Sequence, residues 1–220
     1  MRLCKRIYFL LQRCRMPRSV RITKEKILTA ALDILIRDGY SAVNIKSIAK
    51  ELQCSTQPIA WQFGSMDRLR EALTREAVAY ANRSMMSDSE ACVDAFWQVG
   101  RAYIDLAFDT PKLFRFLYMG ESRAYCRGEY ASILTDKGNA ALIERLGSCL
   151  HIDKERAGKL FQRMLVYTHG IVSLVVSGVL NCTKAQVREL VKDFGAEQLS
   201  LTGTDLDIAA VMSQLDEGAG

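Results

Sequence analysis

The sequence is poor in proline and glycine, with 3 and 14 of these residues among 220. With 49% hydrophobic and 25% charged residues, this scarcity excludes a collagen-like or disordered chain and indicates a folded protein with a sizeable core. Histidine is rarer still, because the sequence contains only His151 and His169, and their spacing does not suit a metal site. We therefore expect neither a metal nor a cofactor.

Membrane spans, disulfides and catalytic motifs are also missing from the sequence. His169, Ser173 and Ser177 interrupt the most apolar segment, so it falls short of the roughly 18 residues that a spanning helix requires, and we expect no membrane partner. The seven cysteines are odd in number and form no CxxC pair, which is typical of reduced thiols and predicts a cytoplasmic protein. Without a nucleophile elbow, P-loop or GxGxxG motif, we do not expect an enzyme.

Positive charge is concentrated in the N-terminal part of the chain. Residues 1–83 contain 16 basic and 7 acidic side chains, whereas residues 84–220 contain 14 and 18. This asymmetry predicts that the N-terminal part faces a polyanion, with nucleic acid favoured over an anionic membrane surface. Residues 1–21 carry no acidic side chain and lack a signal-peptide pattern. They are either a basic arm along phosphates or, up to residue 15, an upstream extension of a chain that begins at Met16.

Apolar residues repeat at helical spacing and no alternating strand pattern is present, so we predict an all-α fold of about nine or ten helices. Thr23 and Gly39 are expected to cap the two ends of the first helix, and Asn44 the start of the second. The third helix is predicted to begin at Ser55 and the fourth after Ser65. Later helices are predicted from Cys92 to Leu106, from Pro111 to Met119, from Glu129 to Leu146 with Gly147 as the stop, and after Asp153. Thr183 and Gln186 form a predicted capping box for a helix that Gly195 closes, and a last helix is predicted from Thr204 to Leu215.

The second and third predicted helices have the proportions of a helix-turn-helix, with the turn at Gln53 and Cys54. In such a pair, early residues of the second helix lie against base edges in the major groove of DNA. Glutamine can bond adenine through two hydrogen bonds, and threonine can contact the methyl group of thymine. We therefore expect double-stranded DNA as a partner, with base contacts from Thr56, Gln57, Trp61 and Gln62, and further contacts from Lys24, Asn44, Lys46 and Ser55.

The stretch from Ile22 to Leu73 resembles the DNA-binding domain of the TetR family of bacterial transcriptional regulators. The resemblance rests on Ile27, Ala30, Ala31, Gly39, Tyr40, Ile48, Ala49, Cys54, Ser55, Phe63 and Leu69. It implies a helix-turn-helix DNA-binding domain at 22–66 and an α-helical regulatory and dimerisation domain at 67–220. Ala60 stands where the family usually has tyrosine and Met66 where lysine is common, so each removes a phosphate contact that Lys46, Lys50 and the arm could replace.

Two shorter segments, residues 111–116 and 168–170, resemble the C-terminal domain of the TetR branch called WHG. This resemblance implies a homodimer formed through the last long helices, and a small apolar or amphipathic ligand that moves the two DNA-reading heads. Seven aromatic or sulfur-containing residues are candidates for lining a ligand pocket, and the alternative is that they are ordinary core residues. They are Phe96, Trp97, Tyr103, Phe116, Tyr118, Met164 and Tyr167. Interface candidates are Ile171, Leu174, Val175, Val187, Leu190 and Phe194.

The function that these patterns predict is a homodimeric repressor that a small molecule releases from its operator. The alternative is a ligand-binding dimer of the same fold that has lost sequence-specific DNA binding, a hypothesis that Ala60 and Met66 motivate. The two hypotheses differ in one measurable property, because only the first predicts an affinity for DNA that falls steeply with salt.

Overall fold

The computed structural model describes residues 22–85, 92–120 and 137–217, and its regular elements in these ranges are all helical. The all-α prediction is therefore confirmed for this part of the chain. The elements are α2 (Lys24–Asp38), a 3-10 helix (Tyr40–Ala42), α3 (Ile45–Glu51), α4 (Gln57–Phe63), α5 (Met66–Ser84), α6 (Cys92–Asp109), α7 (Pro111–Tyr118), α9 (Lys137–Leu150), α10 (Lys154–Val176), α11 (Lys184–Ser200) and α12 (Ile208–Glu217). The basic arm and the predicted helix start at Glu129 lie outside the described residues.

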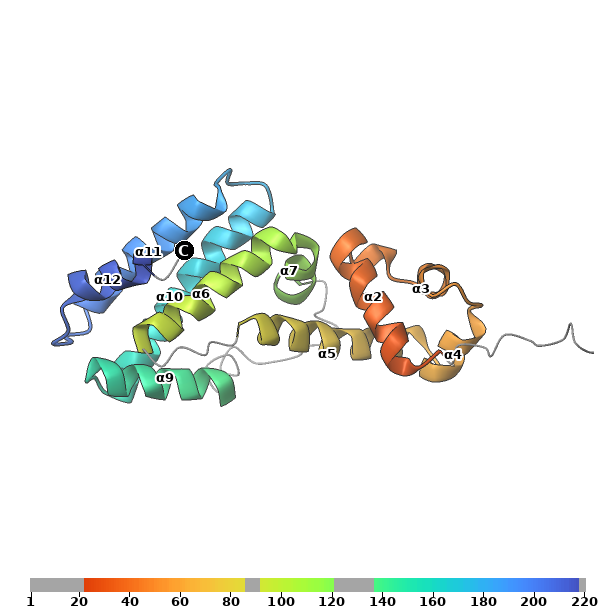
Figure 1. The fold of residues 1–220 in the computed structure, drawn as a ribbon, viewed down its shortest axis with the longest axis horizontal. Coiled ribbons are helices and arrows are strands. Elements are labelled where there is room, and N and C mark those ends of the chain that lie inside the picture. Colours follow the sequence, from red (N-terminus) through yellow and green to blue (C-terminus); the bar gives the residue numbers. More distant parts are fainter. Residues whose placement is uncertain (1–21, 86–91, 121–136, 218–220) are drawn as a thin grey trace, which may run out of the picture.

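The molecule is elongated, with a three-helix head at one end and a helical bundle at the other (Figure 1). The head consists of α2, α3 and α4, and α5 runs from the head toward the bundle. In the bundle, α10 packs against α6, α9 and α11, while α12 packs against α6 and α11. Within the described residues, no helix is long and apolar enough to cross a membrane.

Capping groups fix the ends of the head helices where the sequence predicted them. The Thr23 hydroxyl accepts a hydrogen bond from the backbone N–H of Lys26 at 3.4 Å. Gly39 ends α2 with a φ of +96°, a conformation that strains residues with a side chain. Asn44 Oδ1 accepts from two N–H groups of the first turn of α3, both at 3.0 Å, and Ser47 Oγ accepts from the Asn44 N–H in return. These local bonds confirm the predicted starts of α2 and α3.

Two helices begin later than predicted because local turns precede them. α4 begins at Gln57 instead of Ser55, since Gln53 adopts a left-handed φ of +50° and lengthens the turn after α3. α12 begins after the predicted Thr204, whose hydroxyl accepts a hydrogen bond from the Leu206 N–H at 3.3 Å. Such a side-chain bond competes with helical hydrogen bonding.

Two glycines that were predicted to end helices lie inside them instead. α9 continues past Gly147 and α11 continues past Gly195. A Cβ atom on Gly147 would lie 3.2 Å from the carbonyl oxygen of Ile152, and one on Gly195 would lie 3.3 Å from Met164 Cε. Both glycines therefore mark close approaches between successive or neighbouring helices, a role that the local sequence does not reveal.

α7 joins the head to the bundle. Phe116 is fully buried, and its ring centroid lies 4.9 Å from that of Tyr40, just after α2. Lys112 Nζ donates to the carbonyl of Arg37 near the end of α2, at 2.5 Å. On its other side, Arg115 donates to the last carbonyl of α10. Two cations of α7 thus bind the C-terminal ends of one head helix and one bundle helix. Cations are favoured there because the free carbonyls carry partial negative charge.

Charged residues connect α6 to α11 along the bundle. Lys184 Nζ lies 2.6 Å from an oxygen of Asp109 and 3.5 Å from one of Asp105, and Arg188 also donates to Asp105. Both cations belong to the first two turns of α11, whose start is fixed by the predicted Thr183 and Gln186 capping box. The carboxylates of α6 therefore determine how α11 lies across it.

Candidate functional site

The inner face of α4 is locked into the core of the head. Ile59 and Phe63 are buried, as is Ile48 on α3, and α4 packs against α2, α3 and α5. Burying each of these large side chains stabilises the head by about 2 kcal/mol. Packing within the head therefore fixes the orientation of α4, and the opposite side of the helix faces solvent.

The outer face of α4 carries three of the predicted base-reading residues. Gln57 is the first residue of the helix and Thr56 is its N-cap, and the Thr56 hydroxyl makes no capping hydrogen bond. Trp61 lies one turn after Gln57 and is 93% exposed. An indole so exposed gains nothing from the core, so its large apolar surface is available to a partner. We call Thr56, Gln57 and Trp61 the α4 reading face.

Three other predicted DNA contacts are engaged within the head. The Asn44 amide caps α3 with its oxygen, and its nitrogen donates to a carbonyl that precedes the helix at 3.1 Å. Gln62 Nε2 donates to the Ile22 carbonyl at 3.3 Å, which ties α4 to the start of α2. The Lys24 ammonium lies 5.2 Å from the centre of the Phe63 ring. In this structure these three side chains hold helices of the head in position. Polar residues near helix starts can serve either this purpose or contact with DNA.

The charge of the head itself is modest. Residues 22–66 contain five basic and four acidic side chains. One of the cations, Arg37, bridges α2 and α3 by donating to both oxygens of Glu51 at 3.2 and 3.0 Å, and these hydrogen bonds lower the pKa of that carboxyl. Lys46 and Lys50 on α3 are exposed, as is Ser55 before α4. α3 thus adds two exposed cations to the head, and Lys50 lies near Arg37 and Glu51 where α3 meets the end of α2.

The structure distributes the predicted ligand-pocket residues over several separate contacts. Tyr103 and Tyr118 come together, with ring centroids 5.2 Å apart. The others lie elsewhere: Phe116 against Tyr40 of the head, Phe96 against Phe161, Tyr167 stacked on Phe194, Met164 beside Gly195, and Trp97 half-buried on α6. These contacts divide the seven candidates among several neighbours, and their role as a ligand pocket stays a prediction.

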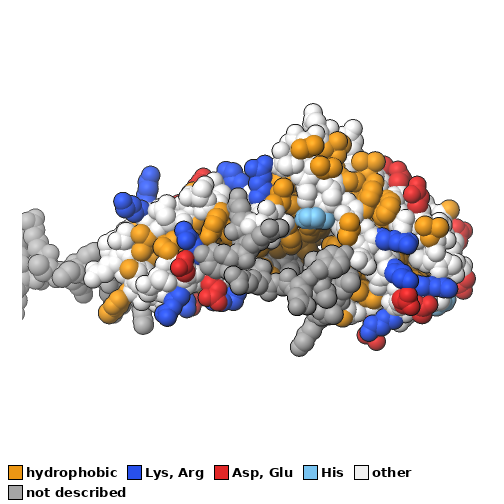
Figure 2. All heavy atoms as spheres, turned by 180° about the vertical axis from the view of Figure 1, so that it is seen from behind, with side chains coloured by type: hydrophobic (Ala, Val, Ile, Leu, Met, Phe, Trp, Pro, Cys, Tyr) orange, Lys and Arg blue, Asp and Glu red, His pale blue; other side chains and the backbone are white. Residues whose placement is uncertain are grey.

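Tyr103 belongs to an aromatic cluster that contains a chain of hydrogen bonds. Its hydroxyl lies 2.8 Å from His169 Nδ1, and Ser173 Oγ lies 3.3 Å from His169 Nε2. The Phe114 ring packs against both Tyr103 and His169. Burial raises the pKa of Tyr103 and lowers the pKa of His169, so both side chains are neutral at pH 7. Figure 2 shows a histidine beside a recess in the bundle whose floor is hydrophobic.

Sequence reasoning did not choose three members of this cluster as site residues, namely Phe114, His169 and Ser173. Phe114 was part of the WHG-like segment but was not chosen as a site residue. Ser173 follows His169 by four residues, the spacing at which side chains on one helix meet. That spacing was a usable signal, whereas the pairing of His169 with Tyr103 depends on how α6 and α10 pack.

Apolar side chains remain exposed on α10 and α11. Val166, Leu174 and Leu190 are 55%, 45% and 41% exposed. Between them, the Tyr167 ring stacks on the Phe194 ring with centroids 3.9 Å apart. With half-buried Ile171 and Val175, these residues form the α10–α11 apolar surface. The interface prediction for Val187 is corrected by its complete burial in the core of the bundle.

Comparison with known proteins identifies the head. Residues 27–73 match the family model described as bacterial regulatory proteins, tetR family. Residues 27–73 form a TetR-family N-terminal domain. The TetR-type match begins within α2, covers α3 and α4, and ends within α5. The α4 reading face therefore lies inside it. No curated protein matches the sequence significantly.

The whole TetR-type fold is shared with solved structures at low sequence identity. A TetR-like transcriptional regulator from Rhodococcus sp. RHA1 is 16% identical and has a TM-score of 0.56, over 84% of this chain and 99% of that one. A tetR-family regulator from Streptomyces coelicolor is 18% identical, with a TM-score of 0.59 over 88% and 87%. A TetR variant from Acinetobacter baumannii AYE in complex with minocycline is 15% identical, with a TM-score of 0.54 over 83% and 99%. These likenesses establish the fold, a helix-turn-helix head on a helical bundle.

Proposed function

We propose that this protein is a TetR-type transcriptional regulator that reads DNA with the α4 reading face. The observation that carries the proposal is the combination of a buried inner face of α4 with an outer face that exposes Gln57 and Trp61. Gln57 would bond an adenine edge, and the Thr56 methyl group and the Trp61 indole would contact thymine methyls or sugars. Lys46 and Lys50 would contact phosphates beside the same groove.

The protein would act as a homodimer through the α10–α11 apolar surface. Exposed apolar side chains gathered on two packed helices are typical of a surface that a partner covers. A two-fold axis across this surface would present two heads to half-sites about 34–36 Å apart on one side of the duplex. Each head alone would make few contacts, so pairing the two heads would supply both affinity and specificity.

The regulatory step would consist of a small neutral ligand that binds beside the aromatic cluster of Tyr103 and His169. α7 supports such coupling, because Phe114 contacts that cluster while Phe116, two residues later, contacts Tyr40 of the head. A ligand that displaces α7 would therefore shift the head, and binding of DNA and ligand would oppose each other. The minocycline complex of the Acinetobacter baumannii neighbour supports a small-molecule effector.

Repression would follow from occupancy of the operator, and release of the head would restore transcription. Deleting the gene should then raise transcription from the promoter to which the protein binds. Unchanged transcription would contradict repression, and reduced transcription would make the protein an activator.

A ligand-binding dimer without DNA-reading ability is the second candidate. It is favoured by Ala60 and Met66, which lack the phosphate contacts of the family pattern, and by the nearly balanced charge of residues 22–66. Such a protein would dimerise and bind its ligand but would bind all duplexes weakly and alike.

Substitution of Gln57 tests the reading face directly. A library of duplexes should yield one preferred half-site for the wild-type protein. Gln57→Ala should bind that site about tenfold or more weakly and lose preference at one base pair, because a two-bond contact to a base contributes about 1–3 kcal/mol of discrimination. Arg75→Gln, an exposed substitution on α5, is the control and should leave base preference unchanged. Unchanged selectivity of Gln57→Ala would exclude Gln57 from base reading.

A further inference from the structure

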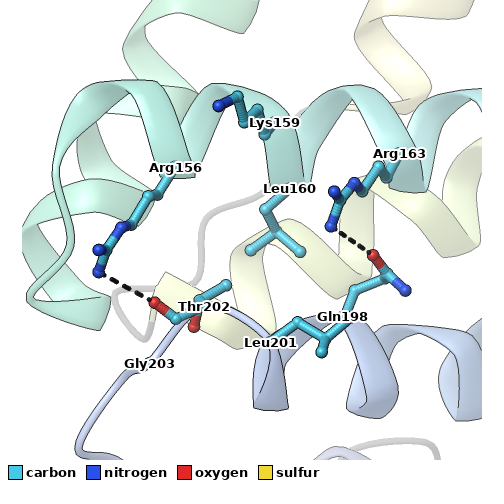
Figure 3. Close-up of a pocket in the computed structure, with 8 residues that line it drawn as sticks. All are labelled: Arg156, Lys159, Leu160, Arg163, Gln198, Leu201, Thr202 and Gly203. Atoms are coloured by element: carbon cyan, nitrogen blue, oxygen red, sulfur yellow. Dashed lines mark hydrogen bonds between the residues drawn. The ribbon is translucent and has the colours of Figure 1, made fainter.

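A hollow lies between α10 and α11 (Figure 3). The helix ends that line it lie at the end of the bundle far from the head (Figure 1). It has a volume of about 300 Å³, at the small end of the range for ligand sites. The first turns of α10 form one wall, and the last turn of α11 with the segment after it forms the other. The hollow lies apart from both the α4 reading face and the Tyr103 cluster.

The residues around the hollow supply positive charge and hydrogen-bond donors without any carboxylate. Arg156, Lys159 and Arg163 line it from one face of α10, and Leu160 and Leu201 add an apolar patch between the polar ends. The Lys159 ammonium itself turns outward to Glu155, at 2.6 Å. The two guanidinium groups are therefore the charges that face the space.

Neighbouring groups hold both guanidinium groups in place. Arg163 donates to Gln198 Oε1 at 3.2 Å, and Arg156 donates to the Thr202 carbonyl at 3.4 Å, across the hollow (Figure 3). Arg156 also pairs with the exposed carboxylate of Asp153. Among the described residues, no carboxylate pairs with Arg163, so its positive charge has no neighbouring anion to compensate it. Guanidinium groups held in place in advance bind an anion at a lower entropic cost.

Gln198 supplies a second reason to expect a ligand here. Its side chain is nine-tenths buried, and its oxygen is used by Arg163. Its Nε2 group makes no hydrogen bond to any described residue and is not fully buried, so solvent reaches this donor. A ligand oxygen that displaces this solvent would accept a hydrogen bond from the amide.

We propose that this hollow binds a small organic dianion that carries an anionic oxygen group at each end. Arg156 and Arg163 are seven residues apart, which corresponds to about 10 Å along α10. One carboxylate or phosphate would bind Arg163 and the Gln198 amide, and the other would bind Arg156. The short aliphatic middle of the ligand would lie over Leu160 and Leu201. Guanidinium groups suit this role because they bond carboxylate and phosphate oxygens in pairs.

Calorimetric titration of the full-length protein without DNA tests the proposal. The probes are adipate and 3-phosphonopropionate, each with an anionic group at both ends, which separate dicarboxylates from phosphorus oxyanions, with hexanoate as the single-charge control and sodium chloride to match ionic strength. At least one dianion should bind saturably and about tenfold or more tightly than hexanoate, because each charge-assisted hydrogen bond adds affinity. Equal or undetectable binding of all probes would overturn the proposal.

Matched variants locate the binding. Arg163→Gln should lower dianion affinity about tenfold, to near that of hexanoate, whereas Arg75→Gln removes an exposed arginine of α5 and should leave it unchanged. Equal losses in both variants would show a general charge effect and refute the site. If Arg163→Gln instead weakens self-association while wild-type protein binds no dianion, the hollow receives acidic side chains of a second copy and the proposal is wrong. Neither result depends on DNA binding, so this test stands apart from that of the proposed function.

Discussion

Truncation of Leu174 on the α10–α11 apolar surface should weaken the dimer without unfolding the chain. Complete burial of a leucine stabilises a protein by about 2 kcal/mol, so the 45% that is exposed here corresponds to about 1 kcal/mol in each copy. A two-fold axis uses the residue twice, which gives about 2 kcal/mol for Leu174→Ala and about a thirtyfold rise in the dimer dissociation constant.

Light scattering coupled to size exclusion, over a dilution series, would measure that dissociation constant. Val78→Ala is the matched control, since Val78 is also an exposed aliphatic residue, 38% exposed, but lies on α5. Circular dichroism should give nearly unchanged helix content for both variants. If Leu174→Ala and Val78→Ala dimerise as the wild-type protein does, the α10–α11 apolar surface is not the dimer interface and the reasoning is refuted.

Three further predictions concern the head and the aromatic cluster. Trp61→Ala should change the free energy of unfolding by less than about 0.5 kcal/mol, because the indole is exposed, yet lower DNA affinity about tenfold or more; a large loss of stability in urea would contradict this assignment. Asn44→Ala should destabilise the protein by about 1 kcal/mol through loss of the α3 cap, and an unchanged melting temperature would be the contrary result. Because burial lowers the pKa of His169 from its ordinary 6.5, the unfolded state takes up the proton first as pH falls. Stability should therefore be fully present above pH 6.5 and decrease below it, and urea titrations should show a weaker decrease in His169→Gln.

Local sequence rules were sufficient for the features that depend on neighbouring residues. Thr23, Asn44 and the Thr183 capping box were predicted correctly because each cap bonds backbone groups within three residues. The reading face was also within reach, since the buried Ile59 and Phe63 leave the opposite side of a short helix to solvent. The helical repeat of 3.6 residues alone assigns these residues to a buried and an exposed face of the helix.

Features that depend on packing between distant elements were not predictable in the same way. Gly195 looks like a helix end, and only the approach of Met164 from α10 explains why it lies inside α11. Gln62 was predicted to read bases from its place on the helix, whereas its bond to the Ile22 carbonyl, 40 positions earlier, depends on how α4 packs against the start of α2. The hollow lined by Arg163 likewise requires the alignment of α10 with α11, which no local pattern contains.

The most direct measurement for the central claim is fluorescence anisotropy of the purified protein with duplex DNA that flanks its gene, at several salt concentrations. A scrambled duplex of the same length and composition is the control. The account predicts tighter binding to the flanking duplex, with an affinity for both that falls steeply as salt rises, because lysine contacts release counterions from phosphates. Equal affinity for the two duplexes, or no binding to either, would contradict the claim that α4 reads DNA.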